Sequence, residues 1–184
     1  MNTVVKNIKD LNSSERNEIV NFLIWCFSEN PDYKNSVYSN PDLDSCVLLH
    51  QGKELVGHVG ITRRKIIQND KPYVIAGIGD VAIKPELRHS GLGIQIMNEL
   101  NKVLKSQDYD VGILFCHPKL HDFYAKSGWY KKEVGKVFAE RKGVLEDQRL
   151  TYLLPLKLDK TDMDVWNSED IAIGIGNWWK CFSR

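Results

Sequence analysis

Apolar residues recur at helical spacing near the start of the chain. Five of them share one face at a period of 3.6 residues: Ile19, Phe22, Leu23, Cys26 and Phe27. The preceding Asn12-Ser-Ser-Glu15 can cap a helix. The pattern therefore predicts a first helix over 13–28, which Ser28-Glu-Asn-Pro31 ends. The stretch from there to Asp44 is rich in Asn, Pro, Ser and Asp, which predicts a polar loop.

The next apolar segments have the length and turn residues of strands. Segments 46–49 and 55–61 flank Gln51-Gly52, which indicates a hairpin. The second strand can continue to Ile67, where Asn69-Asp70 turns the chain into another long strand over 73–83. The sequence thus predicts an antiparallel meander that follows a helix.

The hydrophobic period changes again after Pro85. A helical face ends near Gln107 and consists of Ile96, Met97, Leu100, Val103 and Leu104. We expect a strand at 111–115, a short helix ended by Gly128, and last strands at 134–138 and 150–158. Helices and strands do not alternate strictly, which favours the α+β class, a mixed and mostly antiparallel sheet flanked by helices. We expect one domain over 1–184, with a C-terminal tail at 159–184 near the functional site.

Composition narrows the function classes. The chain has 184 residues, with 25 Lys and Arg against 24 Asp and Glu, a formal charge of +1. This balance gives no electrostatic reason to expect nucleic acid or anionic lipid as a partner. No apolar run is long enough for a membrane span, and the N-terminus lacks a signal sequence, so we expect a cytoplasmic protein. The sequence leaves a homodimer open.

Cysteines and histidines do not form a metal-binding pattern. The four cysteines are scattered, without a Cys-x-x-Cys pair, and we interpret them as free thiols: Cys26, Cys46, Cys116 and Cys181. His117 and His121 have the i, i+4 spacing of a ligand pair, but Pro118 lies between them and no third ligand is evident. We therefore expect no metal.

The segment Arg88-His-Ser-Gly91-Leu-Gly93 lies between the long strand and its helix. Glycines allow backbone N–H groups to turn toward one point, and the helix N-terminus adds a positive field, so the segment is suited to a phosphate or pyrophosphate. The alternative is that the glycines serve only the turn.

The order of these segments resembles the GNAT acetyltransferase superfamily. The resemblance rests on the strand Ala76-Gly-Ile-Gly-Asp-Val-Ala-Ile-Lys-Pro85, the Arg-x-x-Gly-x-Gly loop, the amphipathic helix and Phe123-Tyr-Ala-Lys-Ser-Gly-Trp129, over about 45–158. It implies the GNAT acyl-CoA N-acyltransferase fold and acetyl-CoA as co-substrate. The resemblance also implies that main-chain groups near Val81 and Ile83 pair with pantetheine. The pyrophosphate is then expected on the amides of Arg88, His89, Ser90, Gly91, Leu92 and Gly93.

Two residues are candidates for acid and base chemistry. Asp80 is the only charged residue between Tyr73 and Ile83, and a carboxylate in an apolar strand needs a partner or a task. It could accept the proton of an amine, or it could form a structural ion pair. Tyr124 matches the family tyrosine near the coenzyme sulfur and could protonate the departing thiolate, or it could be a core tyrosine. We disfavour a covalent mechanism at Cys116-His117, because adjacent side chains usually diverge.

The acceptor is indicated by further resemblance. Segments from Gly57-His-Val-Gly-Ile-Thr-Arg-Arg onward, with Leu154-Pro-Leu156 and a Trp-bearing tail, are similar to the aminoglycoside 2'-N-acetyltransferases. The nodulation N-acyltransferases, which act on a chitooligosaccharide amine, share the late Pro strand and the tail. The expected substrate is a small-molecule amine, first an aminoglycoside 2'-amine and second another amino sugar or oligosaccharide amine. A member that binds CoA without catalysis is a further alternative. The expected substrate-binding residues are Asp42, Asp44, Asp80, Asp147, Asn177 and Trp179.

Overall fold

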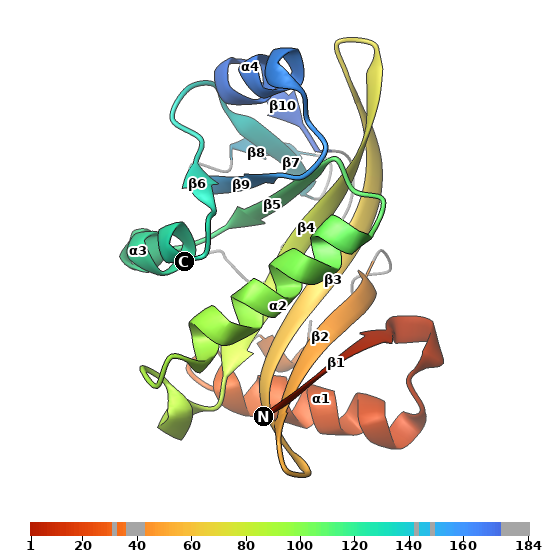
Figure 1. The fold of residues 1–184 in the computed structure, drawn as a ribbon, viewed down its shortest axis with the longest axis vertical. Helices are drawn as coiled ribbons and strands as arrows, with labels where there is room; N and C mark the ends of the chain where they lie inside the picture. The colour runs from red at the N-terminus through yellow and green to blue at the C-terminus, as the bar shows by residue number, and fades with distance from the viewer. Residues whose placement is uncertain (31–32, 36–42, 142–143, 148–149, 174–184) are drawn as a thin grey trace. The chain divides into compact units, whose positions relative to one another are not determined.

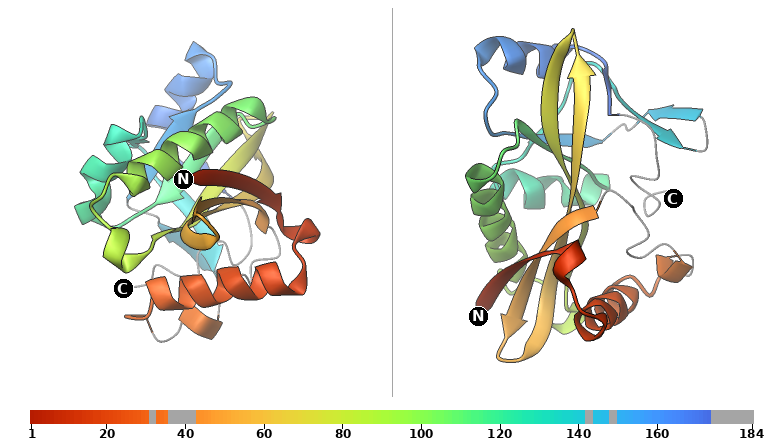
Figure 2. Two further views of the ribbon diagram at one scale, coloured as in Figure 1. Left: turned by 60° about the horizontal axis from the view of Figure 1, so that its bottom comes forward. Right: turned by 90° about the vertical axis from the view of Figure 1, so that its right-hand side faces the viewer.

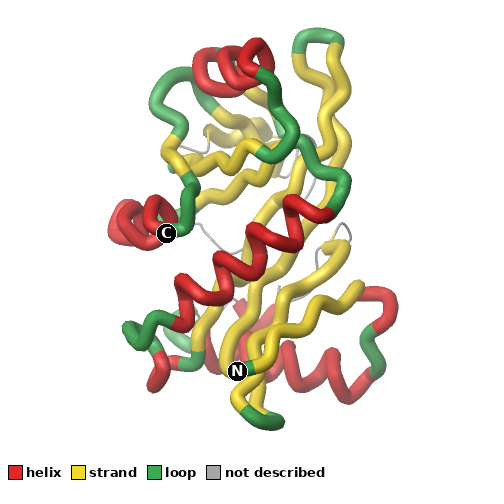
Figure 3. The backbone as a smooth tube through the Cα atoms, viewed as in Figure 1, coloured by secondary structure: helices red, strands yellow, loops and turns green. Residues whose placement is uncertain are grey.

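The computed structural model describes residues 1–30, 33–35, 43–141, 144–147 and 150–173 of the protein. The helices are α1 (Ser13–Cys26), α2 (Leu92–Ser106), α3 (His121–Lys126) and α4 (Lys160–Ser168). The strands are β1 (Asn2–Asn7), β2 (Leu43–Gln51), β3 (Glu54–Gln68), β4 (Lys71–Ile83), β5 (Val111–Phe115), β6 (Tyr130–Lys131), β7 (Val137–Arg141), β8 (Val144–Asp147), β9 (Thr151–Pro155) and β10 (Ile171–Ala172). Figure 1 labels these elements, and Figure 3 distinguishes helices from strands by colour.

Seven strands form one sheet in the order β1-β2-β3-β4-β5-β9-β6. Three more strands form a second sheet in the order β10-β7-β8. The pairs β1–β2, β2–β3, β5–β9, β6–β9 and β7–β8 are antiparallel, whereas β10 runs parallel to β7. The predicted α+β class, with a mixed and mostly antiparallel sheet flanked by helices, is confirmed.

The described chain divides into two compact units. The first contains residues 1–62 and 78–103, and the second contains residues 63–77 and 104–173. Strands β3 and β4 contribute residues to both units. We describe each unit by itself, and the predicted single domain over 1–184 stays a prediction.

In the first unit, α1 and α2 cover opposite faces of the strands (Figure 2). Residues of α1 and alternate residues of β2 share one apolar cluster, which includes Leu23, Cys46 and Leu48. On the other face, Gly57 leaves room for α2, because a Cβ there would lie 3.2 Å from the Ile96 side chain. Side chains of a strand alternate between its faces, so the period-two pattern serves both helices.

Helix α1 begins as the sequence predicts. The Asn12 side chain accepts a hydrogen bond from the Glu15 N–H at 2.9 Å, and the Glu15 carboxylate accepts from the Asn12 N–H at 3.0 Å. This reciprocal pair satisfies two N–H groups that a helix start would otherwise leave without partners. The helix ends at Cys26, whose carbonyl accepts a hydrogen bond from Arg88 of the β4–α2 loop.

The second unit is tied together by buried aromatic and polar contacts. A Cβ on Gly112 would meet the Trp129 ring at 2.7 Å, so β5 packs directly against that indole. Asp159 caps α4, and the Asp162 carboxylate completes the capping box and accepts a hydrogen bond from the Tyr73 hydroxyl at 2.8 Å. The Tyr73 and Trp166 rings meet edge to face at 5.5 Å. These contacts attach α4 to the β3–β4 hairpin.

Some elements differ from the sequence-based prediction. Strand β1 was not predicted, and the expected loop up to Asp44 was too long, since β2 begins at Leu43. The expected tail at 159–184 contains helix α4 and strand β10. Tertiary contacts decide these cases: β1 pairs with β2 along its whole length, and Asp162 of α4 binds β4 residues.

No helix in the described ranges is long and apolar enough to cross a membrane.

Candidate active site

The loop between β4 and α2 is built for backbone contacts. His89 and Gly91 have φ of 63° and 89°, in the left-handed region that glycine tolerates best. A Cβ on Gly91 would meet nothing within 4 Å, so the backbone is open on that side. Helix α2 starts directly afterwards at Leu92, and its first N–H groups lack partners within the helix. The loop therefore presents amides and the positive end of a helix dipole to an anion.

The Arg88 side chain holds this loop in place. Its Nη2 donates to the Cys26 carbonyl at 3.0 Å, and its Nε donates to the Ile83 carbonyl at 3.4 Å. The Ser90 hydroxyl donates to the Leu87 carbonyl at 2.6 Å. The guanidinium thus joins the end of α1, the end of β4 and the loop, while the amides of the loop carry the predicted ligand contact.

The end of β4 carries the residues expected to pair with pantetheine. The Lys84 N–H donates to the Val56 carbonyl at 2.9 Å, so β3 accompanies β4 to this point. The Ile83 carbonyl also accepts from the Cys26 thiol at 3.8 Å. Arg88 Nε and the Cys26 thiol already use both lone pairs of this carbonyl, so pairing of an extended ligand with Ile83 would use its N–H. The roles of Val81 and Ile83 stay predictions.

Asp80 occupies an unusual position within β4. Its φ is 50°, a left-handed conformation that costs free energy for any residue other than glycine. Its Oδ1 accepts a hydrogen bond from the Tyr33 hydroxyl at 2.8 Å. Burial raises the pKa of the Asp80 carboxyl, and the bond from Tyr33 partly opposes that rise because it stabilises the ionised form. The residue is thus a carboxyl with increased basicity, fixed by a tyrosine.

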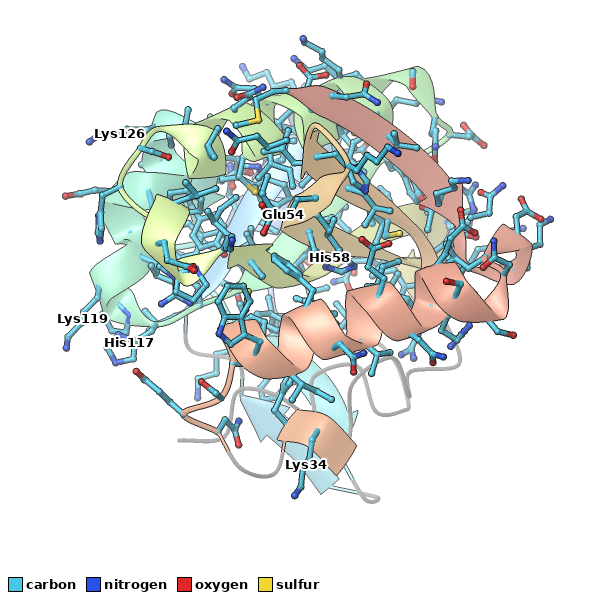
Figure 4. The ribbon with its side chains drawn as sticks, turned by 90° about the horizontal axis from the view of Figure 1, so that it is seen from below. Lys34, Glu54, His58, His117, Lys119 and Lys126 are labelled. Carbon is cyan, nitrogen blue, oxygen red and sulfur yellow. The ribbon has the colours of Figure 1, made fainter. Side chains whose placement is uncertain are left out.

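His58 contacts the same residue through its backbone. The His58 Nδ1 lies 2.8 Å from the Asp80 carbonyl oxygen, and the imidazole is fully buried on β3 (Figure 4). A carbonyl can only accept, so Nδ1 carries the hydrogen. Burial lowers the pKa of the His58 imidazole from 6.5 to about 4, which keeps the ring neutral.

Tyr124 lies in α3 of the second unit and is 5% exposed. Its ring meets Phe123 edge to face at 4.8 Å and lies 5.9 Å from Tyr152. Burial raises the pKa of the Tyr124 phenol, and the nearby Cys116 raises it further. The phenol therefore keeps its proton at neutral pH. Because Asp80 and Tyr124 lie in different units, the expected cooperation of the two residues stays a prediction.

Cys116 and His117 do not pair as a nucleophile and its base in this unit. Burial raises the pKa of the Cys116 thiol to about 11, and a hydrogen bond with Tyr152 partly opposes this. The Tyr152 hydroxyl also lies 2.9 Å from Nδ1 of His121, while Nδ1 of His117 accepts from the Lys119 N–H at 3.2 Å. A thiol with a raised pKa is a poor nucleophile at neutral pH.

The acidic candidates for acceptor binding are only partly described. Asp44 is exposed on β2 and lines a cavity of about 360 Å³ to which Lys9 and Arg16 also contribute. Asp147 ends β8, opposite Phe138 in the strand register. The remaining expected residues, Asp42, Asn177 and Trp179, lie outside the described residues.

No group of three or more His, Cys, Asp and Glu side chains suited to a metal ion occurs within the described part of the chain.

Sequence reasoning missed Tyr33 and His58. Tyr33 falls in a segment interpreted as a polar loop, yet its side chain is 2% exposed. His58 is a polar residue in the otherwise apolar stretch 55–61 of β3, the same kind of signal that singled out Asp80. The contacts of both residues with Asp80 span 47 and 22 positions, so no local pattern could have predicted them.

Comparison with known proteins identifies the class. Residues 7–131 match the family model described as "Acetyltransferase (GNAT) domain". This match covers more than half of the chain, and the protein therefore belongs to the GNAT acetyltransferase family.

Solved structures share the fold. A GNAT family N-acetyltransferase (YhbS) from Escherichia coli, in complex with CoA, matches with a TM-score of 0.66 at 14% identity over 98% of this chain and 93% of its own. An aminoglycoside 6'-N-acetyltransferase complexed with coenzyme A gives 0.57 at 14% identity, over 83% and 97%. A probable N-acyltransferase from Enterococcus faecalis gives 0.55 at 24% identity over 75% of this chain. The matched part of that protein is 33% of its length.

Replacing His58 by Asn is expected to change how stability depends on pH. The His58 pKa is lowered on folding from 6.5 to about 4, so the unfolded chain binds the extra proton as the pH falls below 6.5. Between about pH 7 and pH 5 the wild type should lose about 2 kcal/mol more unfolding free energy than His58→Asn. Denaturant unfolding of both proteins across this range measures the difference in unfolding free energy. Groups that titrate in the same way in both proteins cancel in this difference. Parallel pH profiles would show that His58 is not buried as a neutral ring.

Proposed function

We propose that this GNAT domain is an acetyl-CoA-dependent N-acetyltransferase that acts by direct attack of a primary amine on the thioester. The observation that carries the proposal is the loop from Arg88 to Gly93, whose open, left-handed backbone leads into the N-terminus of α2. The family match supports the reaction class. The first acceptor class is an aminoglycoside 2'-amine, and the second is another amino sugar or oligosaccharide amine.

The residues of the loop fit the phosphate groups of CoA. A pyrophosphate that contacts backbone amides needs a surface without Cβ atoms, and Gly91 provides open space there. Arg88 is already engaged with two carbonyls, so it orders the loop rather than serving as a free cation. Bound acetyl-CoA would supply the activated acetyl group, and the amides of 88–93 would fix its position.

Asp80 is the proposed base. An attacking amine must lose a proton, and a carboxylate whose pKa is raised by burial is a stronger acceptor than an exposed one. The proton passes to the carboxylate directly or through one water, while the new C–N bond forms. Tyr33 fixes the carboxylate through Oδ1.

Tyr124 is the proposed acid. The C–S bond breaks as the amide forms, and the departing thiolate takes a proton from the phenol, which burial keeps protonated. The raised pKa of Cys116 supports direct transfer over a cysteine-bound acetyl group.

The acceptor assignment rests on resemblance. The Leu154-Pro-Leu156 strand and the Trp-bearing tail favour an amino sugar. One structural neighbour is an aminoglycoside N-acetyltransferase, although it acts at the 6' position. This chain has Asn177 two positions before Trp179, where the aminoglycoside 2' family tends to have the Asp of an Asp-x-Trp motif. This loss of one acid keeps the second acceptor class in consideration.

Calorimetry with CoA tests the loop, with two matched glycine variants. Gly91 and Gly52 both have positive φ and open space around a Cβ, so alanine strains the backbone alike at either position. Gly91→Ala should weaken CoA binding by about tenfold or more, because the amides move. Gly52→Ala, in the β2–β3 turn, should leave the affinity unchanged. Absence of CoA binding to the wild type at about millimolar concentration would refute the proposal.

A thiol-release assay with a panel of amines identifies the acceptor. Release of CoA from acetyl-CoA is expected with aminoglycosides that carry a free 2'-amine and absent with analogues that lack it. Acetylation of amino sugars or chitooligosaccharide amines alone would select the second class. CoA binding without release on any amine would identify a member that has lost catalysis.

Tyr124→Phe should lower kcat by about 100-fold or more and leave CoA affinity nearly unchanged, because the hydroxyl acts only as the thiolate leaves. Tyr130→Phe is the matched control: the hydroxyl of this half-buried tyrosine of β6 donates to the Met163 sulfur at 3.9 Å, and kcat should not change. Wild-type turnover in Tyr124→Phe would remove that residue from the mechanism.

Tyr33→Phe should move the acidic limb of the kcat/KM profile to higher pH. The hydroxyl stabilises ionised Asp80, so its removal raises the Asp80 pKa, and the active carboxylate is then lost at a higher pH as the solution is acidified. Stopped assays across the acidic range measure the shift against Tyr130→Phe. An unchanged limb would mean that Asp80 does not set it.

A further inference from the structure

The backbone of Asp80 needs support that its own side chain cannot give. Left-handed φ values cost free energy for a residue with a Cβ and persist only where neighbouring groups hold them. Asp80 adopts φ 50° within strand β4, where regular alternation would otherwise set the side-chain direction. The direction of the Asp80 carboxylate therefore depends on what fixes this one backbone conformation.

A residue of strand β3 forms a hydrogen bond with the backbone of Asp80. His58 Nδ1–H donates to the Asp80 carbonyl at 2.8 Å, from a ring that is fully buried. Gly60 of the same strand borders this contact: a Cβ there would lie at ordinary contact distance, 3.4 Å from the Gly79 carbonyl oxygen and 3.5 Å from the His58 ring. The peptide groups on either side of the left-handed residue thus face a glycine and a histidine of the same strand.

Two hydrogen bonds from different segments therefore hold Asp80. Tyr33 holds the carboxylate, and His58 holds the carbonyl. The two contacts are separable, because one sets the side-chain rotamer and the other sets the backbone from which the side chain projects.

We propose that His58 is a positioning residue, whose Nδ1–H fixes the left-handed backbone of Asp80 and so aims the carboxylate at the acceptor amine. The inference rests on the proposed function, in which Asp80 accepts the amine proton. Burial keeps the ring neutral, so it offers this one donor over the working pH range.

Two substitutions of His58 separate positioning from packing. His58→Leu removes the donor and should lower kcat by about 10-fold to 100-fold, while the dissociation constant of CoA stays unchanged. His58→Asn places an amide N–H near the position of Nδ1, so its kcat should lie within about threefold of the wild-type value. His50→Leu on β2 is the matched control and should retain wild-type kcat. Equal losses in the Leu and Asn variants, or wild-type kcat in His58→Leu, would overturn the proposal.

The Asp80→Asn background tests whether His58 acts through Asp80. Adding His58→Leu to Asp80→Asn should cause no further loss of kcat, since the positioned group is already gone. An additional loss equal to that in the wild-type background would refute the positioning role. Wild-type turnover in Asp80→Asn itself would instead contradict the proposed function. An inactive Asp80→Asn with a fully active His58→Leu would overturn only the present inference.

Stability provides a readout that is independent of activity. Glycine tolerates positive φ, so Asp80→Gly removes the need for an anchor. His58→Leu should lower the unfolding midpoint less in the Asp80→Gly background than in the wild type. If His58→Leu does not fold alone, recovery of folding in Asp80→Gly supports the proposal. An equal decrease of the midpoint, or failure to fold, in both backgrounds would show that His58 only fills the core.

Discussion

The first unit depends on how it accommodates one carboxylate in an apolar layer. Asp80 lies on the strand whose Ala82 belongs to the cluster packed under α1. Asp80 is partly buried, and a carboxyl with reduced access to water needs hydrogen bonds or must take up a proton. The Tyr33 hydroxyl supplies such a bond from the segment that follows α1, and the left-handed backbone of Asp80 is bonded to His58. The segment that follows α1 and strands β3 and β4 thus meet at one residue.

The loop from Arg88 to Gly93 is held by the ends of the same helix α1 and the same strand β4. An anion held by amides needs a rigid backbone more than it needs cationic side chains. Arg88 provides rigidity, because its guanidinium bonds the carbonyls that end α1 and β4. Ile83, which accepts one of these bonds, lies three positions after Asp80. The proposed proton acceptor and the proposed phosphate loop therefore lie close together in the sequence, within residues 80–93, and hydrogen bonds to other segments hold both of them.

Local patterns explain how much of this the sequence could predict. Apolar periodicity and the Asn12–Glu15 box predicted α1 closely, and the turns at Gly52 and Asn69-Asp70 predicted the meander. The loop from Arg88 to Gly93 could be predicted from the sequence because all of its functional groups lie within six consecutive residues. Tyr33 and His58 were not, since their roles arise only when distant segments meet. Helix α4 was missed for the same reason: its Asp162 binds Lys71 and Tyr73, about ninety positions earlier.

Desolvation then assigns opposite roles to the buried ionisable groups. Burial disfavours the charged form of every acid, so it raises the pKa of Asp80, Tyr124 and Cys116 alike. For a carboxyl, whose ordinary pKa is far below neutrality, a rise increases its strength as a base. For a phenol or a thiol, the same rise keeps the proton in place. A cysteine relay would need the thiolate that burial suppresses, whereas direct transfer needs one basic carboxylate and one protonated phenol. The same physical cause therefore favours the direct reaction.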